Sequence, residues 1–160
     1  MKRIFILSVL LLTAASVFAQ TGKSIYEKYS VNDNVSAVYI SPAMFRIIGK
    51  IPDLKVEDGN VDLAPVISQL TGMYILDSQN KSINANLKSE VSQFISKGKF
   101  ELMMEAKDNG QVMRIYTIGD QKTVTGFVLF SEEEEETSFI CIEGKMDRAQ
   151  LEQILSSQMK

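Results

Sequence analysis

The sequence contains no histidine, so any chemistry near neutral pH would depend on its carboxylates and its single thiol. This excludes serine–histidine and cysteine–histidine pairs and histidine metal sites. The best isolated acids are Asp77, Glu101, Glu105 and Glu143, but none is spaced like a known motif and each lies in or beside a strand-like stretch. We therefore predict no catalytic residue. The alternative, a carboxylate- or metal-dependent hydrolase, requires at least two of these acids in one pocket.

The only cysteine is Cys141, and its neighbours are Phe139, Ile140 and Ile142. Such apolar surroundings are typical of a strand interior, where cysteine packs as a small hydrophobic residue. We expect a buried structural thiol, and a single cysteine cannot form an internal disulfide.

Two acidic segments are candidate cation sites. The run from Asp58 to Asp62 begins like a calcium loop, but Leu63 and Gln69 stand where an EF-hand needs glycine and glutamate. The five consecutive glutamates, 132–136, could attract divalent cations or a basic partner. A solvated hairpin tip is the simpler reading, because charges there discourage edge pairing. We predict no metal site and no cofactor.

The first 19 residues have the pattern of a secretory signal peptide. Lys2 and Arg3 precede an apolar run from Ile4 to Leu12, and Val17-Phe18-Ala19 ends in a small residue. We expect cleavage after Ala19, a periplasmic product, and no transmembrane segment in the mature chain, because this apolar run is too short to span a bilayer. The predicted organisation is a signal peptide over 1–19 and a single α+β domain over 20–160.

Net charge gives no sign of a nucleic-acid partner. The chain carries a formal charge of −3, and loss of Lys2 and Arg3 with the signal peptide leaves −5. Glutamates 132–136 carry five negative charges, so the rest of the mature chain is neutral by count. Without a basic stripe to neutralise phosphates, we expect no nucleic acid to bind.

The hydrophobic patterns predict helices and strands in the order helix, strand, two helices, strand, helix, four strands, helix. The longest helix has apolar residues at helical spacing, namely Ile83, Leu87, Val91, Phe94 and Ile95. The last four strands are too close together for crossover helices. The predicted fold class is α+β, with a mainly antiparallel sheet of about six strands and helices packed on at least one face.

Asn109-Gly110 predicts a two-residue type I′ turn in the first hairpin. This register places Glu105 opposite Arg114 and Met103 opposite Tyr116. We expect one face of the hairpin to point into the core, namely Phe100, Leu102, Met104, Ala106, Met113 and Ile115.

The second hairpin, from Val124 to Ile142, is apolar on both faces. If Ser131 opposes Thr137, then Phe127, Leu129 and Phe139 share a face with Cys141. Either helices cover both faces or one face is a contact surface, and we expect helices over the other face and a partly open binding surface at these three residues. The predicted function is therefore an exported, non-enzymatic binding or interaction domain, whose partner is an envelope protein, a lipid or a second copy.

Three stretches carry a family resemblance: Tyr26 to Ser30, Val38 to Phe45, and Ile140 to Met146. They resemble small exported proteins of Bacteroides-type bacteria catalogued as domain of unknown function 4252. The resemblance implies an exported domain and assigns no catalytic residue. Family members often have a lipid-attachment cysteine after the signal, which this sequence lacks. The resemblance also suggests a role in the envelope-stress response.

Overall fold

A computed structural model describes residues 21–50 and 63–158 of the chain. The predicted signal peptide and the predicted turn at Asp58–Asp62 lie outside these residues. The order of the described elements agrees with the order predicted from the sequence. Among the described residues, no helix combines the length and the hydropathy needed to span a bilayer.

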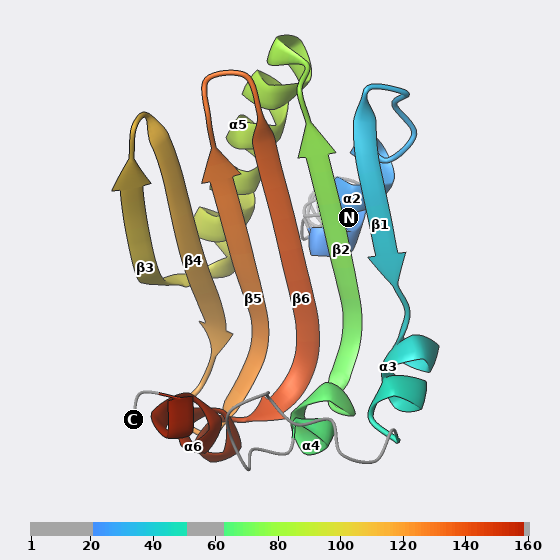
Figure 1. The fold of residues 1–160 in the computed structure, drawn as a ribbon, viewed down its shortest axis with the longest axis vertical. Coiled ribbons are helices and arrows are strands. Elements are labelled where there is room, and N and C mark those ends of the chain that lie inside the picture. The colour runs from blue at the N-terminus through green and yellow to red at the C-terminus, as the bar shows by residue number, and fades with distance from the viewer. Residues whose placement is uncertain (1–20, 51–62, 159–160) are drawn as a thin grey trace, which may run out of the picture.

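Six antiparallel strands form one sheet in the order β1-β2-β6-β5-β4-β3 (Figure 1). The strands are β1 (Val35–Ile40), β2 (Leu70–Ser78), β3 (Glu101–Asp108), β4 (Gln111–Gly119), β5 (Thr123–Glu132) and β6 (Thr137–Asp147). The last four strands pair as two successive hairpins, and β2 joins β6 in the middle of the sheet. The predicted α+β fold with a six-stranded antiparallel sheet is confirmed.

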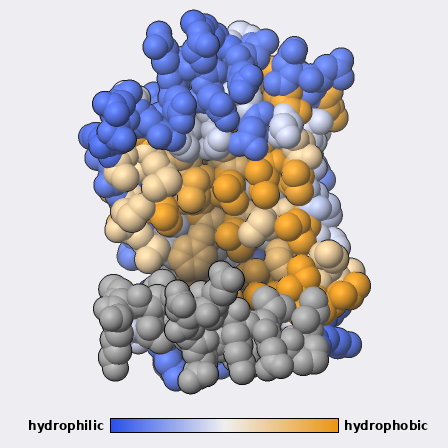
Figure 2. Space-filling model, in the orientation of Figure 1, coloured by the Kyte–Doolittle hydropathy of each residue, from blue (hydrophilic) through white to orange (hydrophobic). Residues whose placement is uncertain are grey.

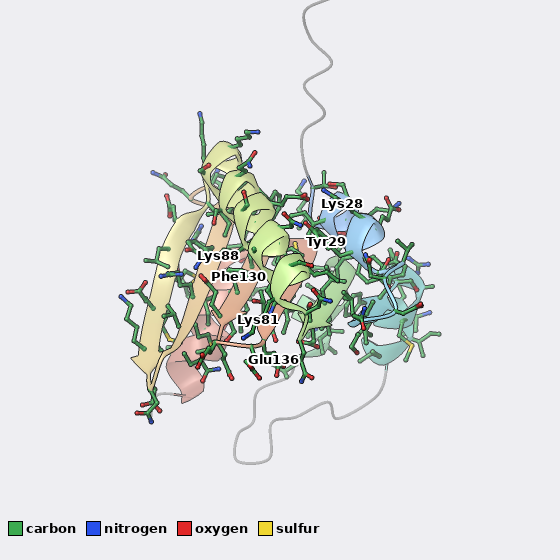
Figure 3. The ribbon with its side chains drawn as sticks, turned by 90° about the horizontal axis from the view of Figure 1, so that it is seen from above. Lys28, Tyr29, Lys81, Lys88, Phe130 and Glu136 are labelled. Atoms are coloured by element: carbon green, nitrogen blue, oxygen red, sulfur yellow. The ribbon has the colours of Figure 1, made fainter. Side chains whose placement is uncertain are left out.

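Two helices pack on one face of the sheet, and the other three described helices lie at its lower end (Figure 1). The packed helices are α2 (Gly22–Tyr29) and α5 (Lys81–Gly98), and those at the end are α3 (Pro42–Ile48), α4 (Ala64–Ile67) and α6 (Arg148–Gln158). Seen from above, α5 and α2 both lie on the same side of the strands (Figure 3).

The core lies between these two helices and the sheet. Leu87, Val91 and Phe94 of α5 are buried, as the helical spacing predicts, and Ile25 of α2 is fully buried beside them. Alternate residues of the central strands complete the core, namely Tyr74, Leu76, Val128, Phe130, Phe139 and Cys141. The predicted burial of Cys141 is confirmed.

The first hairpin has the predicted turn and most of the predicted register. Asn109 and Gly110 both have positive φ, and Glu105 lies opposite Arg114. A bulge between Leu102 and Met104 shifts the pairing beyond it by one residue. Tyr116 therefore lies opposite Leu102, and the predicted pair of Met103 with Tyr116 was wrong.

The predicted core face of this hairpin was also wrong. Because the bulge inserts one residue, Leu102 shares the helix-covered face of the sheet with Tyr116, whereas Met104 and Ile115 lie on the opposite face. Every residue of β3 is exposed, since β3 is the edge strand farthest from α2.

The second hairpin has a register one residue away from the prediction. Thr137 lies opposite Glu132, not Ser131, and the Glu133 N–H donates to the Glu136 carbonyl at 2.8 Å to close the tip. Glu132 belongs to the strand because its carboxylate pairs with Arg114 and Lys88. A shift of one residue exchanges the two faces of a strand, and this determines which side chains of β6 are exposed.

Candidate functional site

The face of the sheet opposite α2 and α5 is here called the open face. Its central row takes one apolar residue from each strand, in sheet order Val38, Ile75, Ile140, Leu129, Ile115 and Met104. The row below it contains Ile40, Met73, Ile142, Phe127, Thr117 and Glu101. Ten of these twelve side chains are apolar, so the open face has the composition of a core, not of a solvated sheet surface.

These apolar side chains form a continuous band across the molecule. Figure 2 shows hydrophobic residues from one edge of the sheet to the other, below a hydrophilic upper end. The ends of the central row are well exposed, with Val38 at 46% and Met104 at 43%, whereas the four residues between them are half-buried by one another. No described helix covers the middle of this band (Figure 1).

Two of the three predicted binding residues lie on the open face. Phe127 and Leu129 are half-buried there, as predicted. Phe139 is fully buried on the helix-covered face, so its assignment to the binding surface was wrong. The cause is the register of the second hairpin, which pairs Phe139 with Phe130 and so places Ile140 on the open face.

Several open-face residues were not identified from the sequence. Ile75 and Val38 belong to strands whose neighbours in the sheet are distant in the chain, so local spacing could not align them with Leu129. For Met104 and Ile115, the spacing in the first hairpin predicts a place in the core instead. The available signal was the apolar character of both faces of each central strand, which is equally typical of a sheet covered on both faces and so does not identify the open-face residues.

A third row lies on the open face above the apolar band. In sheet order it consists of Ser36, Asp77, Ser138, Ser131, Met113 and Ala106, and the first four of these are polar. The Ser138 hydroxyl donates to Asp77 Oδ1 at 2.5 Å. A polar cavity of about 560 Å³ lies at this upper end, lined by Asp33, Asp77 and Glu136 among others. The apolar band thus has a polar border at its upper side, over β1, β2, β6 and β5.

The glutamate run is only partly a free, solvated tip. Glu132 is held between Arg114 and Lys88, and Glu135 pairs with Lys81 at 3.3 Å. Gln79 Nε2 donates to Glu136 Oε2 at 3.3 Å. The Asn84 side chain of α5 donates to the Glu135 carbonyl, so the tip is attached to the helix-covered side. The tip remains the most acidic part of the upper end.

The four isolated acids do not form a shared site. Asp77 lies on β2 and Glu101 on β3, with three strands between them, and Glu105 faces the other way to pair with Arg114 at 2.7 Å. Glu143 lies below Cys141 on the helix-covered side. Across residues 21–50 and 63–158, no cluster of three potential metal-ligating side chains occurs. The site that the hydrolase alternative requires is not assembled from these acids.

Glu143 lines a separate cavity of about 380 Å³ between the start of α2, the end of α5 and the strands. Burial raises the pKa of the Glu143 carboxyl, although the nearby Lys23 acts in the opposite direction. Burial also raises the pKa of the neighbouring Cys141 thiol to about 12, and the charge of Glu143 adds to this effect. A thiol with such a pKa is protonated at neutral pH and is a poor nucleophile.

Comparisons with known proteins assign a family but no activity. The family model described as a domain of unknown function, DUF4252, matches residues 29–154. No curated protein and no solved structure gives a significant match. The match covers β1 to β6, and therefore every strand that contributes to the open face. The chain belongs to the family of the domain of unknown function DUF4252.

Proposed function

We propose that this protein is an exported, non-enzymatic interaction domain of the periplasm, and that the open face of its sheet is the contact surface. The observation that carries the proposal is the uninterrupted central row of six apolar residues, one from each strand. A soluble domain gains nothing in folding from apolar side chains that stay in water, whereas a partner that covers them removes their surface from solvent.

The arrangement of polar groups supports the same proposal. Binding surfaces commonly have an apolar centre and a polar rim. Here the apolar band is bordered above by Ser36, Ser131, Ser138 and Asp77. Export is supported by the predicted signal peptide. The absence of a shared site for the four candidate acids removes the specific motive for a hydrolase.

Site-specific photocrosslinking in cells tests this function directly. A photoreactive amino acid at Leu129 samples the open face, and the same amino acid at Ser92 samples the exposed side of α5. Because Ser92 lies on the opposite side of the molecule from the open face, it is the matched control. We expect light-dependent adducts of defined mass from position 129, and none from position 92.

The readout is the mass of the adducts in the periplasmic fraction. Adducts from position 129 alone support a contact surface, whatever the identity of the partner. Equal yields from both positions, or no adduct from either, contradict the proposed function. Recovery of the protein only in the cytoplasm, with residues 1–19 still attached, contradicts the proposed export.

A further inference from the structure

We infer that the partner of the open face is a second copy of this chain, packed sheet against sheet with the strands of the two copies running in opposite directions. This inference rests on the proposed function and identifies its partner. A helix layer on a single sheet leaves one apolar face uncovered, and two such faces can pack at a separation of about 10 Å. The result is a four-layer assembly with helices on the outside.

The size of the face fits a dimer. The open face has three rows across six strands, namely the central row, the row below it and the row of Ser36 and Asp77 above it, and strand spacing and rise give them a flat extent of about 29 Å by about 20 Å. This is about 600 Å² from each copy, or about 1,200 Å² for the pair, which is the lower bound for a specific stable interface. Because the side chains project from the sheet, the accessible area that each copy buries is larger than this flat area. A second sheet of the same width covers the band from Val38 to Met104.

The chemistry of the face also favours a copy of itself. A two-fold interface brings the same surface patch of both copies together, so the patch must be complementary to itself. The central row contains no charge, and aliphatic side chains pack with other aliphatic side chains without a charge pattern to match. The charges of the other two rows are Asp77 in the row above and Glu101 on the edge strand β3 in the row below, so both lie away from the central row.

The acidic tip selects the orientation. The two-fold axis of a face-to-face dimer lies in the interface, either along the strands or across them. An axis along the strands places the two β5–β6 tips together, including Glu133, Glu134, Glu135 and Glu136 from each copy. Like charges placed together oppose association. An axis across the strands separates the tips and places each edge strand over its own counterpart.

Sedimentation equilibrium of the purified protein over a series of concentrations tests the inference. We expect a dimer whose dissociation constant increases at least tenfold in Leu129→Glu and in Met104→Glu. Met104 is 43% exposed, so its substitution leaves the core intact even if the change at Leu129 disturbs folding. Ser92→Glu on α5 is the matched control and should dimerise like the wild type.

A short bis-maleimide then distinguishes the two orientations. With the axis across the strands, Met104→Cys crosslinks to the same residue of the partner copy. With the axis along the strands, Met104→Cys crosslinks instead to Val38→Cys when the two variants are mixed. The wild-type protein is the control, since its single thiol, Cys141, is buried.

Each outcome decides the inference. A wild-type dimer that both open-face variants weaken, with self-crosslinking at position 104, supports it. A monomer throughout the series overturns it, as does a dimer that neither variant weakens, and crosslinking only to position 38 overturns the orientation. If the protein is monomeric but position 129 still forms adducts with another molecule in cells, the proposed function stands and only the choice of partner fails.

Discussion

Phe130 of β5 and Phe139 of β6 lie directly opposite each other, and both rings are buried on the helix-covered face of the sheet. Successive residues of a strand point to opposite faces of the sheet. Phe127 lies three residues before Phe130 and therefore points to the open face. The two faces of this hairpin therefore differ in environment although both are apolar in sequence. One belongs to the core and the other to the proposed contact surface.

The first prediction compares two phenylalanines on these two faces. Phe139→Ala should lower the free energy of unfolding by about 3–5 kcal/mol, because it leaves a cavity in a closed core. Phe127→Ala should cost clearly less, since Phe127 is only half-buried in the isolated chain. Urea denaturation of both variants, at a concentration where the protein is monomeric, measures the difference. Equal losses would mean that the assignment of the faces is wrong.

The second prediction concerns the end of α5. Lys99 is the left-handed residue that ends this helix, with φ of 56°, whereas a Cβ on Gly98 would lie 2.6 Å from the Phe100 ring. Lys99→Gly should stabilise the protein by about 1 kcal/mol, because glycine adopts positive φ without a steric penalty.

Gly98→Ala is the matched change one residue earlier. It should destabilise the protein by about 1–3 kcal/mol, because the added methyl group meets the Phe100 ring. Thermal denaturation of both variants checks the pair. The opposite signs are the prediction, and a shift in the same direction for both variants would contradict it.

The third prediction is a pH dependence at Glu143. Burial raises the pKa of this carboxyl above its ordinary value of 4.5 in the folded protein. The unfolded chain therefore loses its proton first, and folding becomes less favourable as pH rises above about 4.5. Glu143→Gln removes this penalty, so the variant should be more stable than the wild type at pH 7.

The comparison of the two proteins isolates Glu143 from the other titrating groups. At pH 4 the Glu143 carboxyl is largely protonated in both states, so the stability difference between wild type and Glu143→Gln should become small. Urea denaturation at pH 4 and pH 7 measures both differences. An advantage of the variant that is the same at both pH values would show that burial of the charge is not its cause.

Local patterns were enough to predict the elements and the turn of the first hairpin. The spacing of Leu87, Val91 and Phe94 identified the buried side of α5, and Asn109-Gly110 fixed the pairing of Glu105 with Arg114. Each of these features depends on residues close together in the chain. They therefore follow from helical periodicity and turn geometry alone.

The faces of the sheet could not be predicted in the same way. In the sequence Glu132 belongs to a run of glutamates that predicts a solvated turn. In the structure its carboxylate pairs with Arg114 and Lys88, and Glu132 lies in β5 opposite Thr137, one residue away from the predicted register. No glycine or polar residue in the apolar stretch from Leu102 to Met104 indicates the bulge that the structure has there. Because both faces are apolar, hydrophobic alternation could not correct either error, and Phe139 was assigned to the wrong side.

The most direct test of the central claim is the accessibility of position 129 in cells. In Leu129→Cys, a membrane-impermeant maleimide applied to cells with a permeabilised outer membrane should label position 129 slowly, because a partner covers the open face. The same variant, purified and diluted, should be labelled quickly. Ser92→Cys on α5 should be labelled quickly in both settings, and Cys141 should stay unlabelled because its thiol is buried. Fast labelling of position 129 in cells, equal to that of position 92, would contradict the claim that this face is a contact surface.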